Sequence, residues 1–167
     1  MATKSKPSGQ PRHTADHGFT ASGKLAGDLQ RVLVDLIDLH IQGKQAHWNV
    51  VGHNFRDLHL QLDEIIDTAR EASDTIAERM RALQAVPDGR ADIVAGTSSL
   101  PPFPPGEQDT GAVVDLTVAR LNAAVATMRD VHNAVDEEDP SSSDLLHAII
   151  EDLEKYAWMV GSENRTP

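Results

Sequence analysis

Apolar residues recur through most of the chain at spacings of three and four positions, which is the period of an amphipathic helix. In residues 22–51 these positions are Leu25, Leu29, Val32, Leu33, Leu36, Ile37 and His40. In residues 54–83 they are Phe55, Leu58, Leu62, Ile65, Ala69, Ala72, Ile76, Met80 and Leu83. Similar runs follow at about 110–137 and 141–162. The pattern therefore predicts four long helices, and no segment shows the alternation of a strand.

Proline and glycine mark where these helices end. Proline interrupts a helix interior, and all nine prolines lie outside the four predicted helices. Ser22 and Asn54 are residue types that cap helix N-termini, so we expect them at the starts of the first two helices. Gly52 closes the first helix. The connection at 88–109 is long enough to hold a short helix at about 90–95.

Helices of this length and amphipathicity are typical of a four-helix bundle. The short link between the first two makes them antiparallel neighbours, and the long link between the second and third permits the crossover of ferritin-like bundles. The predicted fold is therefore all-α: a ferritin-like four-helix bundle with a long crossover between helices 2 and 3 that carries a short helix. We place this bundle at residues 21–163, after a flexible polar tail at 1–20 and before a C-terminal tail at 164–167.

Composition narrows the chemistry. The 167 residues include no cysteine, which excludes a disulfide scaffold, a thiolate zinc finger, an iron–sulfur cluster and a cysteine nucleophile. The 26 acids and 15 bases give a net charge of −11, which argues against a basic nucleic-acid-binding face. Eight histidines beside these acids favour metals that bind oxygen and nitrogen. Neither an apolar signal-peptide segment nor an uncharged apolar stretch of about 18 residues is present, so we expect a cytoplasmic protein without a membrane span.

The predicted second helix carries one polar stripe that differs from an ordinary surface. At about 100° per residue, His59, Asp63, Asp74 and Glu78 lie within roughly 100° of one another. The apolar stripe is centred roughly 140° away, so these four side chains do not point into the centre of their own bundle. A solvated face is the simplest alternative, because acids and histidines on a helix surface most often have no other role.

Spacing along the helix separates these four residues into two groups. Asp63 and Asp74 are eleven positions apart, about 16 Å along a helix, so they cannot bind one metal within one chain. Two copies of the helix could instead pack antiparallel about a two-fold axis between positions 68 and 69. His59 of one copy would then lie opposite Glu78 of the other, and Asp63 opposite Asp74. One register would therefore assemble two identical sites.

The same register has further consequences. Arg70 would face Asp67 of the other copy, and such reciprocity is what an isologous dimer requires. His47, at the end of the first helix, could fold back and join His59. Two imidazoles and three carboxylates suit iron, with manganese or zinc as competitors. A monomer, or a dimer built on another face, would contradict this hypothesis, and His47 beside Trp48 could instead be a packed interface residue.

The residues around this stripe resemble a known family. The signature consists of HWNVVG at 47–52, then Phe55, His59 and Asp63, and finally DTIAER at 74–79. It resembles the signature of the Dps family (DNA-binding proteins from starved cells), which are ferritin-like mini-ferritins. The resemblance extends over about residues 22–162 and is closest to actinobacterial members.

The resemblance implies a dodecameric cage with tetrahedral symmetry that stores a ferric mineral. Its ferroxidase centres would lie between two-fold-related subunits and oxidise ferrous iron, typically with hydrogen peroxide, which suppresses hydroxyl-radical damage. Carried onto this chain, each centre would consist of His47, His59 and Asp63 from one subunit with Asp74 and Glu78 from the other. Asp74 would act directly, through water or at a second iron. Trp48 has the position of a family tryptophan near the iron, where it takes up oxidising equivalents or packs in the interface.

Family cages also have acidic pores on their three-fold axes, near the start of the last helix. Glu137, Glu138, Asp139 and Asp144 are the candidates in this chain, because a ring of acids attracts cations. The alternative is an ordinary acidic helix end, in which Asp144 only favours the helix dipole.

Some family members bind DNA through lysine-rich tails. The tail of this chain carries Lys4, Lys6 and Arg12 against Asp16, a weak positive charge that twelve copies would multiply. Non-specific DNA binding would depend on this tail, because the acidic body repels phosphate.

The leading interpretation is therefore a homo-oligomeric cage that oxidises and stores iron (Fe²⁺ and Fe³⁺) and protects DNA from oxidative damage. One alternative is a nucleoid-compacting DNA-binding protein with a secondary iron site. The other is a two-fold helical binding protein whose acidic face has no function in metal binding.

Overall fold

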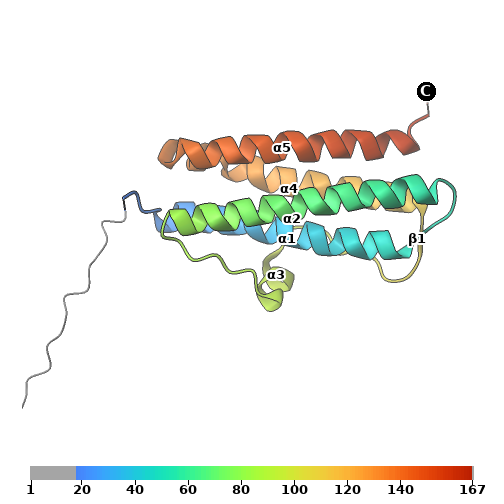
Figure 1. The fold of residues 1–167 in the computed structure, drawn as a ribbon, viewed down its shortest axis with the longest axis horizontal. Coiled ribbons are helices and arrows are strands. Elements are labelled where there is room, and N and C mark those ends of the chain that lie inside the picture. Colours follow the sequence, from blue (N-terminus) through green and yellow to red (C-terminus); the bar gives the residue numbers. More distant parts are fainter. Residues whose placement is uncertain (1–17, 167) are drawn as a thin grey trace, which may run out of the picture.

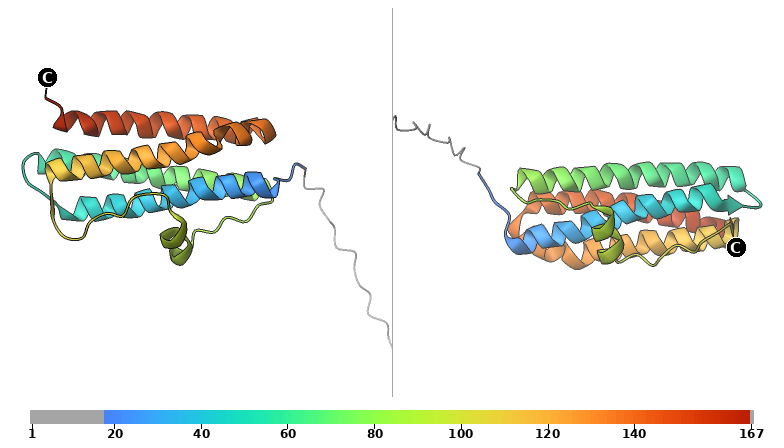
Figure 2. Two further views of the ribbon diagram at one scale, coloured as in Figure 1. Left: turned by 180° about the vertical axis from the view of Figure 1, so that it is seen from behind. Right: turned by 90° about the horizontal axis from the view of Figure 1, so that it is seen from below.

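The computed structural model describes residues 18–166 and shows an all-α bundle. Its long helices are α1 (Gly23–Asn49), α2 (Phe55–Ala82), α4 (Thr110–Glu138) and α5 (Pro140–Gly161). Helix α1 packs on α2 and α4, and α5 packs on α4 and α2, so the four helices enclose one core (Figures 1 and 2). The structure confirms the all-α four-helix bundle that the hydrophobic periodicity predicts.

The connection from α2 to α4 runs back along the bundle. Helices α2 and α4 consequently point in the same direction, as the long link predicts (Figure 1). The connection carries α3 (Ala91–Thr97), which packs on α1. Just before α4, β2 (Gln108–Asp109) pairs in parallel with β1 (Val50–Val51), which directly follows α1. The expectation of no strand is therefore wrong, because two residues are too few to show an alternating pattern.

A buried carboxylate fixes this connection to the bundle. Asp35 of α1 accepts hydrogen bonds from the main-chain N of Ser99 (2.8 Å), from the Ser99 hydroxyl (2.6 Å) and from Oγ1 of Thr127 on α4 (2.6 Å). Within residues 18–166, every buried side-chain nitrogen and oxygen has a hydrogen-bond partner. Because a buried polar group without a partner costs stability, full pairing favours this one arrangement of crossover and helices.

The two predicted helix caps have different outcomes. Ser22 caps α1, because its side chain accepts a hydrogen bond from the main-chain N of Leu25 at 3.1 Å. Asn54 also stands at the N-cap position of α2, as expected, but its backbone is left-handed (φ 58°, ψ 18°) and its side chain forms no capping hydrogen bond. The short reversal between α1 and α2 requires positive φ at Gly52 (φ 117°) and at Asn54, a residue type that tolerates it. The reversal thus overrides the capping preference.

The core consists of the apolar stripes that the sequence indicates. Every position of the predicted α2 stripe is buried except Phe55, which is 43% exposed. Among the described helices, α4 alone is long and apolar enough to cross a membrane by length and composition. Half of that stretch is buried inside the bundle, which is the property of a core helix.

Candidate metal centre

Two histidines meet where the reversal joins α1 to α2. His47 is in the last turn of α1 and His59 is in the second turn of α2, and their rings stack with centroids 3.7 Å apart. His47 Nδ1 lies 3.2 Å from the main-chain O of His59, and His59 Nδ1 lies 3.1 Å from the main-chain O of His47. A carbonyl oxygen only accepts hydrogen bonds, so each Nδ1 carries the hydrogen. Each Nε2 therefore keeps a lone pair for a metal.

Asp63 completes a triad with these rings. It lies one turn after His59 on α2, and its Oδ1 is 3.3 Å from His47 Nδ1. One ligand atom from each of His47, His59 and Asp63 lies within 4.8 Å of the others, and all three residues are half-buried. The fold therefore assembles in one chain the part of the predicted site that the α1–α2 reversal can bring together.

Lys44 is a neighbour that the sequence reasoning missed. Its Nζ donates to Asp63 Oδ1 at 2.7 Å, on the same atom that faces His47. Lys44 lies three residues before His47, and this i, i+3 spacing on one helix face was the signal available in the sequence. The lysine holds the carboxylate in place beside the two rings.

The electrostatics of the triad favour the protonation states that bind metals. Burial lowers the pKa of His47, and the nearby His59 and Lys44 lower it further against the opposing charge of Asp63. The hydrogen bond from Lys44 lowers the pKa of Asp63 despite some burial. A neutral imidazole and an ionised carboxylate are the forms that coordinate a metal ion. Both shifts therefore favour cation binding by His47 and Asp63.

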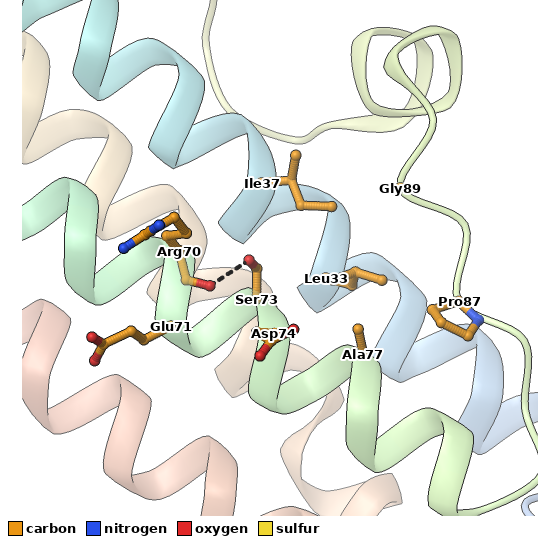
Figure 3. Close-up of a pocket in the computed structure, with 9 residues that line it drawn as sticks. All are labelled: Leu33, Ile37, Arg70, Glu71, Ser73, Asp74, Ala77, Pro87 and Gly89. Atoms are coloured by element: carbon orange, nitrogen blue, oxygen red, sulfur yellow. Dashed lines mark hydrogen bonds between the residues drawn. The ribbon is translucent and has the colours of Figure 1, made fainter.

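Asp74 and Glu78 do not join the triad. Both are exposed and lie three to four turns farther along α2. Asp74 lines a cavity of about 560 Å³ between α2, α1 and the start of the crossover (Figure 3). The other lining residues are Leu33, Ile37, Arg70, Glu71, Ser73, Ala77, Pro87 and Gly89. One chain therefore keeps the two groups of predicted ligands apart, as the spacing along the helix predicts.

Large apolar side chains are exposed on the same two helices. Trp48, next to the triad, is 71% exposed. Ile41, about two turns earlier on α1, is 51% exposed. On α2, Leu60 is 45% exposed and lies one turn before Asp63. Exposed apolar residues that cluster beside polar side chains such as those of the triad are typical of a protein interface.

The predicted pore acids have unequal surroundings. Asp139 is buried, where it accepts hydrogen bonds from Arg79 Nη2 (2.7 Å) and Ser142 Oγ (2.5 Å). Glu138 accepts from the main-chain N (2.7 Å) and hydroxyl (2.6 Å) of Ser22. The Asp144 side chain is 86% exposed. Glu138 and Asp139 thus join helix ends within the chain, whereas Asp144 projects outward.

The predicted DNA-binding residues Lys4, Lys6 and Arg12 lie outside the described residues. Their role therefore stays a prediction from the sequence.

The chain is similar to several known proteins. A model of the ferritin-like domain matches residues 27–165. DNA protection during starvation protein 2 of Deinococcus radiodurans is 32% identical over 79% of this chain, which spans 55% of that relative's length. The fine tangled pili major subunit of Haemophilus ducreyi is 36% identical, and the match covers 89% of this chain and 79% of that protein. The structure of Dps from Microbacterium arborescens in its high-iron form superposes with a TM-score of 0.80, at 30% identity over 87% of this chain and 97% of that one.

Proposed function

The chain belongs to the Dps family of ferritin-like proteins, and from that premise we propose that it oxidises ferrous iron and stores the ferric product in a homo-oligomeric cage. Iron is the substrate and cargo of this activity. With hydrogen peroxide as the oxidant, two ferrous ions each give one electron to one peroxide molecule, which takes up two protons and becomes two water molecules. Removal of peroxide and ferrous iron together would protect DNA in the cytoplasm from oxidative damage.

The observation that carries this proposal is the triad of His47, His59 and Asp63 in one chain, with no second carboxylate ligand of the predicted set within reach. Imidazole and carboxylate ligands suit ferrous and ferric iron. An oxidising centre needs further oxygen ligands and an open position for the oxidant. The predicted carboxylates lie too far along α2 to supply these ligands from the same chain.

A two-fold partner supplies what one chain lacks. With α2 antiparallel to its copy about an axis between positions 68 and 69, Asp63 faces Asp74 of the partner subunit and His59 faces Glu78 of the partner subunit. The same register places the exposed Leu60 opposite Ala77 of the partner subunit. Ala77 lines the apolar side of the cavity in Figure 3, together with Leu33, Ile37 and Pro87. This register therefore joins the two half-sites and covers an exposed leucine.

Trp48 fits the same interface. Its ring is largely exposed in the single chain and directly follows the ligand His47. In the proposed dimer it lies near the iron, where an indole takes up oxidising equivalents or excludes water by packing. Of the pore candidates, Asp144 has the exposure needed to attract cations, and Glu138 and Asp139 would have to exchange their present partners.

The first experiment compares peroxide-driven ferrous oxidation by the wild-type protein and by a His59→Ala, Asp63→Ala variant. We expect the initial rate to fall by at least about 100-fold, because two ligands are lost. His53→Ala, which removes an exposed histidine in the nearby reversal, is the matched control and should retain the rate. Equal rates in the wild type and the double variant would remove the assigned centre.

The second experiment tests whether each centre is shared between chains. A His59→Ala, Asp63→Ala chain and an Asp74→Ala, Glu78→Ala chain should each be inactive alone. After unfolding and co-assembly in equal amounts, mixed dimers contain one intact centre, so about a quarter of the wild-type rate should return. Recovery of no activity, with assembly confirmed, would contradict the proposed register.

Gel filtration and DNA binding test the remaining parts. A dodecamer of 18.1 kDa chains should elute near 217 kDa, twelve times the mass of one chain. DNA binding through Lys4, Lys6 and Arg12 predicts salt-dependent gel shifts that disappear when residues 1–20 are removed. A shift that survives this truncation would favour a nucleoid-compacting role for another surface.

A further inference from the structure

A second histidine pair lies near the other end of the bundle. His132 is in the last two turns of α4, and His147 is in the second turn of α5. These helices pack side by side where α1 begins, at the opposite end from the α1–α2 reversal (Figure 1). The two ring centroids are 4.5 Å apart, and the two Nε2 atoms are 2.5 Å apart. The rings thus point the same nitrogen at one position.

The other nitrogen of each ring faces an oxygen acceptor. His132 Nδ1 lies 3.2 Å from Asn133 Oδ1, and His147 Nδ1 lies 3.9 Å from Asp144 Oδ1. The 3.2 Å contact allows a hydrogen bond from His132 Nδ1 to Asn133, whereas 3.9 Å is too long for one from His147 to Asp144. Metal-binding histidines typically have an outer oxygen that orients the ring, and Asn133 supplies one for His132. The two Nε2 atoms lie within hydrogen-bond range, and either ring can carry the hydrogen between them. A cation would replace that hydrogen and select the tautomer in which both Nε2 lone pairs are free.

The pair opens onto a cavity of about 470 Å³ that contains further oxygen ligands. Its lining includes Arg129, Asn133, Ile150, Glu151 and Glu154. Arg129 forms an ion pair with Glu154. Glu151 lies four residues after His147, a spacing that places both side chains on one face of α5. The cavity wall therefore offers one carboxylate on the same helix face as His147. Its side chain must turn toward the two rings to reach a shared ion.

We propose that His132 and His147 bind a divalent first-row transition metal through their Nε2 atoms, with Glu151 as the third ligand. Two imidazoles and one carboxylate suit zinc, cobalt, nickel and ferrous iron. Bonds of about 2.0–2.1 Å in a tetrahedral site require the two Nε2 atoms to be about 3.3 Å apart. The rings must open by roughly 0.8 Å to reach that separation, which a small rotation of the exposed His147 side chain provides.

One hydroxyl group lies beside the histidine pair. Ser143 Oγ lies 3.1 Å from His132 Nε2, where it can donate a hydrogen bond to the lone pair. Metal binding must displace this weak neutral contact, and the hydroxyl can turn to the carbonyl oxygen one helical turn before it. All three proposed ligands belong to one chain, and none of them belongs to the proposed iron centre. This metal-site proposal can therefore be tested independently of ferrous oxidation.

Cobalt binding tests the proposal. The full-length His59→Ala, Asp63→Ala protein is the parent, because its iron half-site is disabled. Titration with Co²⁺, followed by its visible absorption and by calorimetry, should show one ion per chain. His147→Ala should weaken this binding by more than about 100-fold, because loss of a group that only orients a ligand already costs 10- to 100-fold. His53→Ala in the same parent should bind Co²⁺ as the parent does.

The outcomes are distinct. His147 is exposed and alanine favours a helix, so the variant should retain the far-ultraviolet circular dichroism of its parent. A folded parent that binds no Co²⁺, or a His147→Ala variant that binds it unchanged, would overturn the proposal. Anomalous scattering from Co²⁺-soaked crystals should place the ion between both rings and Glu151; a peak elsewhere also overturns it. Ferrous oxidation by His147→Ala in the wild-type background should be unchanged.

Discussion

The two histidine pairs lie at opposite ends of the bundle and are held in different ways. His47 and His59 hydrogen-bond to each other's main-chain carbonyls, and the His47 side chain is only 11% exposed. His132 is oriented by the side-chain oxygen of Asn133, whereas His147 Nδ1 lies 3.9 Å from Asp144 Oδ1 and the His147 side chain is 55% exposed. Main-chain carbonyls cannot be removed by substitution. The first pair is therefore oriented by the fold itself, and the second by groups that can be changed one at a time.

The pairs also differ in what they lack. The first has one carboxylate, Asp63, held by Lys44, and its other predicted ligands lie three to four turns away on the same helix. The second faces a cavity with carboxylates from its own helix. A site that depends on a partner can respond to assembly, whereas a site within one chain can bind metal before assembly. This difference predicts that the two pairs can be disabled separately.

The largest expected effect comes from His47→Ala. This substitution removes a ligand and the stacking partner of His59, so we expect peroxide-driven ferrous oxidation to slow by at least about 100-fold. The corresponding substitution in the other pair, His132→Ala, should leave the initial rate within about twofold, because distant sites act independently. Stopped-flow absorbance of ferric product measures both. If His132→Ala slowed oxidation as much as His47→Ala, the pairs would belong to one pathway.

The first pair was predictable because its members belong to one hairpin. The spacing of His47, His59 and Asp63 about a short reversal is enough to bring them together, and the helical period shows that Asp74 is out of reach. Lys44 was missed because its i, i+3 spacing to His47 shows a shared helix face but does not by itself indicate contact with Asp63 on the next helix. Asn54 stands at the N-cap position as predicted, but the geometry of the reversal gives it a left-handed backbone, and its side chain makes no capping hydrogen bond.

The second pair was not predicted, because its members come from different helices. His132 and His147 are nearly equidistant from the turn at Asp139 and Pro140, and this symmetry was the available signal. Using that signal requires knowledge that α5 follows α4 with no intervening loop. The sequence pattern predicts a break between two helices at Pro140, and the structure adds that Asp139 alone separates α4 from α5. The sequence therefore indicates which residues can bind a metal, and the turn between two helices determines which of them come into contact.

An intermediate effect is expected at the turn that carries the second pair. Asp139→Asn breaks the ion pair with Arg79 and weakens the hydrogen bond from Ser142, so the variant should lose about 2 kcal/mol of unfolding free energy at pH 7. Burial of Asp139 opposes its ionisation, but these hydrogen bonds and the charge of Arg79 outweigh burial and lower its pKa. Urea unfolding of both proteins measures the difference.

The pH dependence of that difference follows from the lowered pKa. Ionised Asp139 stabilises the folded state above the ordinary aspartate pKa, and this stabilisation is lost as the pH falls through the lower folded value. The stability gap between wild type and Asp139→Asn should therefore be constant from pH 7 to about 5 and shrink below about 4. A gap that grows in acid would contradict the direction of the shift. The iron half-site, at the other end, should not change.

The smallest effect concerns the outer contact of the second pair. Asn133 is exposed and orients His132 through Nδ1, so Asn133→Ala should leave stability unchanged and weaken Co²⁺ binding by about tenfold. Asn133→Asp, which keeps an oxygen acceptor and adds a negative charge, should restore or strengthen binding. Calorimetric titration of both variants in the His59→Ala, Asp63→Ala parent gives the comparison. If both variants bind Co²⁺ like the parent, Asn133 does not orient the ring. The difference between main-chain and side-chain contacts at the two histidine pairs would then have no effect on metal binding.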